Sequence, residues 1–178
     1  KQRGYQDARE AALDANAIPV SVYDNLIEAI HEKLPLMHRY VQLRSKMMKL
    51  DDLHMYDVYA PLVKMPEKTY SFAEAKEIVK RGLAPLGEDY IALLQEGFDN
   101  RWIDVYENEG KRTGAYSWGA YGTHPYVLLN YHGRLGDVFT LAHEMGHALH
   151  SWHSDHAQNY LNAGYRIFVA EVASTCNE

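Results

Sequence analysis

Apolar residues near the start of the chain recur with the periodicity of an α-helix. Over residues 22–50 they recur three or four positions apart, so they share one face of a helix. Pro35 lies inside this stretch. It predicts a kink or a break, because the proline ring clashes with the preceding helical turn.

Two further helices are predicted in the middle of the chain. Ser71 and Glu74 have the spacing of a capping box, in which each residue's side chain bonds the other's backbone amide. This predicts a helix from there to about Leu83. A second helical pattern begins near Gly87 and runs towards Trp102.

The pattern changes after Glu109. Residues 114–122 are rich in glycine and aromatic side chains, and residues 126–131 are suited to a short strand. His132 and Gly133 follow and end that strand. Residues 114–131 therefore predict a small sheet or hairpin within a mainly α-helical protein.

Helical periodicity returns in the last third of the chain. Asp137 is a good N-cap residue, and the apolar positions over 138–149 share one helical face. The stretch 166–178 is again helical in pattern and carries neither a glycine cap nor a proline stop. The sequence therefore predicts two helices in succession after the sheet.

Composition narrows the class of protein. The 178 residues are 47% hydrophobic and 24% charged, which is ordinary for a globular domain. The net charge of −6 argues against a nucleic-acid partner, and no apolar run is long enough to predict a membrane span. The single cysteine, Cys176, is expected to pack as a small buried hydrophobe. It cannot form an internal disulfide, which favours a reducing, cytoplasmic compartment.

The strongest chemical signal is His143-Glu144-Met145-Gly146-His147, which fits the pattern H-E-x-x-H. Residues four apart lie on one helical face, so both imidazoles can reach a single zinc ion. Glu144 lies about 100° round the helix, where it can take the proton from a zinc-bound water. Two satisfied histidines on a polar face are the alternative that these residues alone leave open.

A catalytic zinc usually has three protein ligands, and two residues compete for the third place. His153 has the spacing of the last histidine in the metzincin motif H-E-x-x-H-x-x-G-x-x-H. That motif needs a glycine where this chain has His150. A continuing helix would carry His153 about 15 Å along its axis from His143. Glu171 is favoured, because a lone carboxylate among Val and Ala residues is costly to bury without a metal or a partner.

Several stretches together resemble the oligoendopeptidase F branch of the thimet-oligopeptidase-like zinc metallopeptidases. The resemblance spans nearly the whole chain and is most specific after residue 110. It is carried by GKRTGAYS at 110–117, HPYVLLNY at 124–131, VFTLAHE at 138–144, FVAEVAST at 168–175 and, more weakly, LHMYD at 53–57.

The resemblance implies one zinc ion per chain, bound by His143, His147 and Glu171, with Glu144 as the general base. It implies a helical, zincin-like fold in which short peptides lie in a deep channel beside the small sheet. A strand edge in the 114–131 region would pair with the extended substrate.

Other residues are weaker candidates for the site. Gly114, Ala115, Tyr116 and Tyr126 are expected to contact substrate, although aromatic residues on strands more often only pack. His124 could orient substrate or cap the turn before Pro125.

Glu178 lies seven residues after Glu171 and so near the same helix face. It could hydrogen-bond a ligand histidine, and solvent exposure is an equal alternative.

The chain is expected to form part of one catalytic domain over 1–178, with a helical portion (1–109) followed by the sheet and the zinc-binding helices (110–178). Members of the family are longer and place oxyanion-stabilising histidine and tyrosine residues after the third ligand. The C-terminal part of the domain is therefore expected to be absent, and this chain alone is expected to bind zinc yet catalyse poorly.

The predicted function is zinc-dependent hydrolysis of internal bonds in short peptides. A zinc metallocarboxypeptidase with the same ligand pattern and a catalytically silent peptide-binding fragment are the alternatives.

Overall fold

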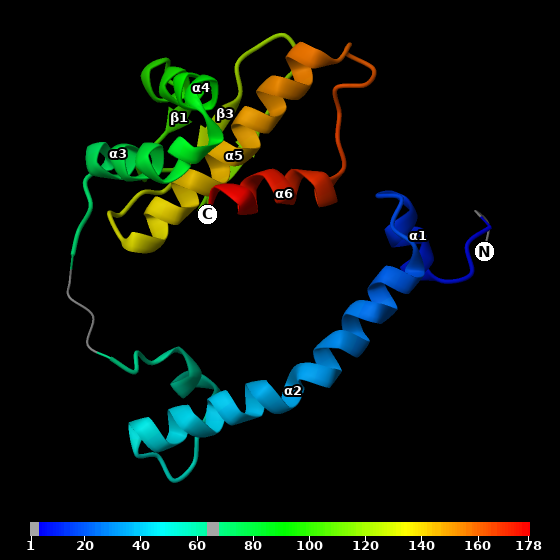
Figure 1. Cartoon of the computed structure of the whole chain (residues 1–178), viewed down its shortest axis with the longest axis vertical. Helices are drawn as coiled ribbons and strands as arrows, with labels where there is room; N and C mark the ends of the chain where they lie inside the picture. Colours follow the sequence, from blue (N-terminus) through cyan, green and yellow to red (C-terminus); the bar gives the residue numbers. More distant parts are fainter. Residues whose placement is uncertain (1–3, 64–67) are drawn as a thin grey trace. The chain divides into compact units, whose positions relative to one another are not determined.

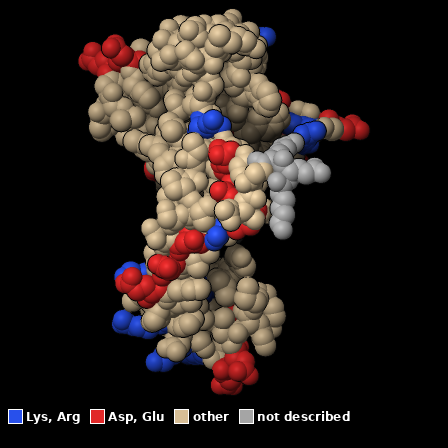
Figure 2. All heavy atoms as spheres, turned by 90° about the vertical axis from the view of Figure 1, so that its right-hand side faces the viewer, with Lys and Arg blue, Asp and Glu red and all other residues tan. Residues whose placement is uncertain are grey.

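The computed structural model describes residues 4–63 and 68–178, and these two ranges belong to separate compact units. The fold is mainly α-helical with one small sheet, as predicted. No helix in the described ranges is both long and apolar enough to span a bilayer. On the face in view in Figure 2, charged side chains form small groups of both signs separated by larger uncharged areas.

The N-terminal unit is built on one long helix (Figure 1). Arg44 is the only buried residue of that helix, and its guanidinium donates to the carbonyl oxygens of Asp57 and Ala60 at 2.8 and 2.5 Å. The helix continues across Pro35 rather than breaking there, and its axis bends midway in Figure 1. The unit comprises α1 (Ala8–Asp14), α2 (Val20–Met48) and the 3₁₀ turn η1 (Met55–Tyr59).

The C-terminal unit is organised around α5, the second-longest helix, which contacts α3, α4, α6 and two strands of the sheet. Its buried residues come from helices and strands alike and include Trp102, Leu94, Leu141 and Met145. The elements are α3 (Phe72–Leu83), η2 (Ala84–Leu86), α4 (Glu88–Asp99), β1 (Ile103–Asp104), β2 (Tyr116–Trp118), β3 (Tyr126–Leu128), α5 (Leu135–Ala157) and α6 (Ile167–Asn177).

The capping box before α3 forms as predicted. The Ser71 hydroxyl accepts from the Glu74 amide at 3.2 Å, and the Glu74 carboxylate accepts from the Ser71 amide at 2.8 Å. The Ser71 hydroxyl also donates to the Glu74 carboxylate at 2.7 Å, and this bond first, then the one from the Ser71 amide, lowers the pKa of Glu74 because both favour its charged form.

The prediction of Asp137 as the N-cap of α5 is wrong. The helix begins at Leu135, and Asp137 lies in its first turn. Its Oδ2 atom accepts from the backbone amides of His132 and Arg134 at 3.0 and 2.8 Å. The carboxylate thus reaches back from the first turn of the helix to accept from amides that precede it, which is the part that the third helical residue plays in a capping box.

The predicted sheet has three strands in the order β1-β3-β2. β2 is antiparallel to β3, with Ser117 opposite Val127, and β1 is parallel to β3. Pairing continues beyond β3, where the amides of Leu129 and Tyr131 donate to the carbonyls of Asp104 and Val105 at 2.8 and 3.0 Å. β2 is therefore an edge strand, and it packs beside α5.

Cys176 is exposed, so the expectation of a buried cysteine is wrong. It lies on α6, whose buried positions are Ala170, Ser174 and Asn177. Those positions are three or four apart and form the face that meets α5, whereas Cys176 lies off that face.

Candidate metal centre

Two histidines project from one face of α5. His143 and His147 are one turn apart, and their rings meet edge to face with centroids 4.8 Å apart. Their side chains are 26% and 16% exposed, so both are partly shielded yet reachable. The helix brings these two side chains together because four residues make slightly more than one turn.

Glu171 on α6 completes a group of three. Its Oε2 atom lies 3.6 Å from Nε2 of His143 and 3.6 Å from Nε2 of His147. Atoms about 2.1 Å from a tetrahedral zinc lie about 3.4 Å from one another, so both separations fit a shared ion. Within residues 4–63 and 68–178 this is the only such cluster of three histidine, cysteine or acidic ligands, all within 4.8 Å of one another.

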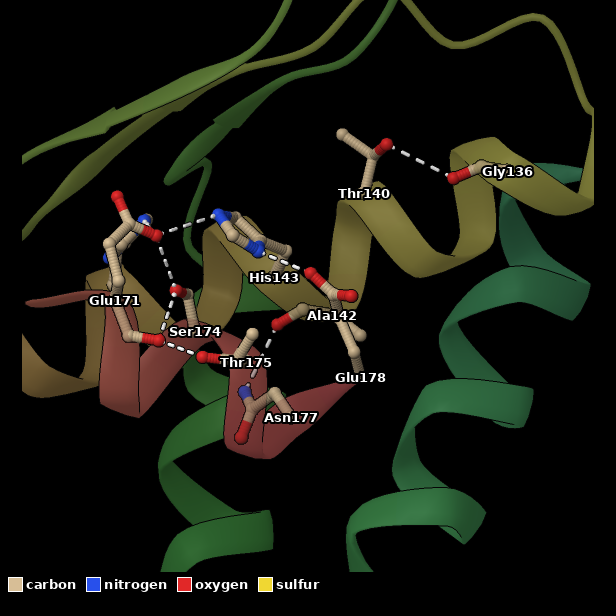
Figure 3. A network of polar contacts seen from close by, with 10 residues as sticks. Gly136, Thr140, Ala142, His143, Glu171, Ser174, Thr175, Asn177 and Glu178 are labelled. Carbon is tan, nitrogen blue, oxygen red and sulfur yellow. Dashed lines mark hydrogen bonds and ion pairs between the residues drawn. The ribbon is translucent and has the colours of Figure 1, made fainter. Parts of the chain in front are cut away.

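Two neighbours hold these side chains in orientation (Figure 3). Oε1 of Glu178 lies 2.5 Å from Nδ1 of His143. An Nδ1–H donated to this carboxylate leaves the Nε2 lone pair facing Glu171. On α6, the Ser174 hydroxyl donates to Oε2 of Glu171 at 3.0 Å.

Glu144 is buried beside the three candidate ligands. It is 7% exposed, and its Oε2 atom has no hydrogen-bond partner in the described part of the chain. Burial raises the pKa of Glu144; the nearby Glu171 raises it further, while His143 lowers it. A buried carboxylate with a raised pKa is a stronger base than one in water.

The imidazole of His147 is held neutral. Burial lowers its pKa, and His143 adds to that effect, whereas Glu171 and the carbonyl of Ala170 oppose it. A neutral ring keeps a lone pair free, which metal ligation requires. The lowered pKa of His147 and its position near His143 and Glu171 therefore both favour a role as a metal ligand.

The other histidines of α5 lie outside the group. His150 stacks on Tyr165 with ring centroids 3.9 Å apart, and burial lowers its pKa. The helix runs unbroken past His153, whose ring meets Trp152 edge to face. His153 is not among the gathered ligands in the described residues.

The residues predicted to contact substrate are divided between two places. Gly114 and Ala115 line a cavity of about 320 Å³ together with Thr140, one turn before His143 on α5. His124 instead lines a different cavity and stacks on Trp102, with its Nδ1 atom 2.7 Å from the carbonyl oxygen of Pro125.

Tyr116 and Tyr126 are 46% and 48% exposed on paired strands. Their side chains are therefore accessible, whereas their backbones belong to the sheet beside α5. The prediction that they touch substrate stays a prediction.

A third cavity lies on α5 beyond the two histidines. It measures about 480 Å³ and is lined by residues 117–119 of the β2 region and by Ser151, one turn after His147. The Ser151 hydroxyl lies 2.6 Å from the hydroxyl of Tyr165. The cavity lined by Thr140 and the cavity lined by Ser151 thus meet α5 one turn before and one turn after the paired histidines.

Sequence reasoning missed Ser174 and Asn177. Both are buried on α6, at 0% and 6% exposure, and both contact the group or its supporting helix. A signal was present for Ser174, which lies three residues after Glu171 and so near its helical face, whereas Asn177, six residues after Glu171, lies on another face.

A family model described as peptidase family M3 matches residues 1–178. The chain is 56% identical over 174 residues to Oligopeptidase PepF of Bacillus subtilis, covering 98% of this chain and 26% of that protein. It is 49% identical over 176 residues to the chromosomal Oligoendopeptidase F of Lactococcus lactis, covering 99% and 29%.

Solved structures agree in fold. The crystal structure of a Chlamydophila abortus protein matches with 46% identity and a TM-score of 0.82, covering 98% of this chain and 29% of that one. Oligoendopeptidase-F from Enterococcus faecium matches with 34% identity and a TM-score of 0.57, covering 99% and 23%.

The chain thus spans under a third of the length of these relatives. The match to the family model extends over every residue and includes both helices that carry the gathered histidines and glutamate. The chain belongs to peptidase family M3.

Proposed function

We propose that this chain forms the zinc-binding part of an endopeptidase that hydrolyses internal bonds of short peptides. The observation that carries the proposal is the meeting of His143, His147 and Glu171 beside the buried Glu144. Two imidazoles and a carboxylate are the ligand set of many catalytic zinc sites, which keep a fourth position open. One zinc ion per chain follows.

When bound, zinc supplies a Lewis acid that polarises the scissile carbonyl and makes water more acidic. Glu144 accepts the proton of the attacking water, a role for which its burial and raised pKa suit it. The same carboxyl group then delivers that proton to the amine that leaves. Glu178 keeps His143 in the tautomer that presents Nε2, through the contact at Nδ1.

An extended peptide pairs with the free edge of β2, since an edge strand offers unpaired backbone groups. Gly114, Ala115 and Tyr116 lie at or just before this strand and contact the peptide. The cavities that meet α5 on either side of the histidines give room for side chains on both sides of the cleaved bond. Backbone pairing gives affinity with little dependence on side-chain identity.

His124 and Tyr126 contribute less directly. His124 lies against Tyr126 on β3, with ring centroids 4.4 Å apart, and the pair would support β3, the strand paired with β2, rather than meet the cleaved bond. A cytoplasmic location accords with the single cysteine of the chain.

The test is a comparison of wild type with Glu144→Gln in the complete polypeptide, on one defined peptide of about ten residues. We expect the wild type to cut internal bonds and the variant to lose turnover while keeping zinc. Loss of single residues from the C-terminus would indicate a metallocarboxypeptidase instead. Peptide binding without turnover in the wild type would indicate a silent binding protein.

A further inference from the structure

The two helices that carry the ligands touch at a glycine. A Cβ atom on Gly146 would lie 2.8 Å from both the carbonyl oxygen of Ala173 and the Cα of Ser174. Contacts this short do not occur between real side chains and backbone, so α6 lies closer to α5 than any residue with a Cβ atom at position 146 would permit. Because His147 follows directly, this approach fixes how far Glu171 stands from the histidines.

Apolar burial contributes little to the placement of α6. Ile167, Phe168, Val169 and Val172 are between 50% and 63% exposed. The buried positions are one alanine and two polar residues. The position of α6 against α5 therefore depends on polar contacts more than is usual for a helix of globular proteins.

Asn177 makes two hydrogen bonds that link α6 to α5 and α4. It is 6% exposed, and its Nδ2 atom donates to the carbonyl oxygen of Ala142 at 3.0 Å (Figure 3). Its Oδ1 atom accepts from the hydroxyl of Tyr90 on α4 at 2.8 Å. A carbonyl oxygen can only accept, so the orientation of this amide is determined by its partners. One side chain thus joins three helices, and Ala142 directly precedes His143.

We propose that Asn177 is a positioning residue for the metal centre, which sets the separation of Glu171 from the two histidines by holding α6 against α5 and α4. The inference rests on the proposed zinc function. It assigns Asn177 no contact with metal or substrate. Metal sites require ligand placement to within about 0.5 Å. The close packing at Gly146 limits movement of α6 towards α5. Asn177 restrains the opposite movement, away from α5.

The test measures the zinc dissociation constant by competition with a coloured chelator, and the visible spectrum of the cobalt-loaded chain. Asn177→Ala is expected to weaken zinc binding by about 10- to 100-fold, the range found for residues that support metal ligands. The cobalt spectrum should shift, because the ligands relax to a different geometry. Asn177→Asp should behave similarly, since its oxygen cannot donate to Ala142.

Tyr90→Phe removes only the outer hydrogen bond and should cause a smaller change in the same direction. It also keeps the proposal testable where Asn177→Ala does not fold. Tyr131→Phe is the matched control, because it removes a tyrosine hydrogen bond of 2.9 Å to the carbonyl of Tyr70 in the same unit. We expect it to lower stability without changing the zinc constant or the cobalt spectrum.

An unchanged zinc constant and cobalt spectrum in Asn177→Ala overturns the proposal. If that variant does not fold, wild-type values in Tyr90→Phe overturn it. Equal effects in Tyr90→Phe and Tyr131→Phe also overturn it, because general loosening of the unit would then explain both. A wild-type chain that binds no zinc contradicts the proposed function itself, and this outcome is separate from the others.

Discussion

Oε1 of Glu178 and Nδ1 of His143 are 2.5 Å apart, although 35 residues separate them along the chain. The contact joins the C-terminal end of α6 to the middle of α5 and commits one ring nitrogen of His143 (Figure 3). The other nitrogen faces Glu171. A carboxylate behind a ligand histidine both fixes the tautomer and makes the ring a better donor to metal.

Replacing Glu178 should weaken zinc binding without abolishing it. We expect Glu178→Ala to raise the zinc dissociation constant by about 10-fold or more, because the ring of His143 loses its anchor. Glu178→Gln should recover part of the loss, since its amide oxygen still accepts from Nδ1–H. Competition with a chelator measures the zinc dissociation constants of the wild type and both variants. Equal constants would show that Glu178 does not support zinc binding.

Glu171→Ala should have a larger effect, because it removes a proposed ligand. Elemental analysis after dialysis should find about one zinc per wild-type chain and a small fraction of that in the variant. Glu28→Ala is the matched control, since Glu28 is also an exposed glutamate on a helix but lies in the N-terminal unit. Full zinc content in Glu171→Ala would rule out this residue as the third ligand.

Glu144→Gln should stabilise the metal-free chain while removing its chemistry. Removal of a buried, unpartnered charge should raise the free energy of unfolding at pH 7.5 by about 1 kcal/mol. Urea titration followed by tryptophan fluorescence measures this in the C-terminal unit, where all three tryptophans lie. Glu88→Gln makes the same change at an exposed position and should have little effect. A less stable Glu144→Gln chain would contradict the inference that the buried carboxylate of Glu144 lowers the stability of the folded chain.

Two glycines of α5 should respond oppositely to alanine. Gly146→Ala should lower the free energy of unfolding by about 1–3 kcal/mol and weaken zinc binding, because the new methyl group forces α6 outward. Gly136→Ala meets nothing within 4 Å and should stabilise the helix by about 0.5–1 kcal/mol. Urea titration and chelator competition report the two effects. A tolerated Gly146→Ala would show that the helices can separate freely.

The metal-free chain should lose stability as the pH falls through about 6.5. Burial lowers the pKa of His147 and His150 in the folded state, so the unfolded chain binds protons first. Between the folded and unfolded pKa values, the free energy of unfolding therefore rises with pH. Urea midpoints at pH 7.5, 6.5 and 5.5 should decline in that order. The decline should be shallower in His150→Gln but not in His31→Gln, a surface control on α2.

Local signals made much of the fold predictable. The capping box at Ser71 and Glu74 fixed the start of α3, and apolar spacing revealed α5 and α6. β1 was missed because two residues cannot display an alternating pattern. Asp137 was misassigned because an acidic residue can cap a helix start from two places. At the N-cap it accepts from amides of the first turn, whereas Asp137 lies in the first turn and accepts from the amides of His132 and Arg134.

Some residues of the candidate site could also be predicted from local sequence, and others could not. His143 and His147 are joined by helix geometry alone, and Glu171 was conspicuous as a charge among apolar residues. Asn177 could not be identified, because its importance comes from Tyr90 and Ala142, which are 87 and 35 residues away in sequence. The exposure of Cys176 likewise depends on which face of α6 meets α5.

β2 pairs over three residues, a length of about 10 Å. A peptide that pairs with this edge can form only a short ladder, and each hydrogen bond in it adds about 1 kcal/mol net. The length of β2 therefore limits how many backbone hydrogen bonds a peptide can form with it. A peptide segment of roughly three residues would already make every backbone bond that this edge offers, so a longer peptide would gain further affinity only through contacts elsewhere.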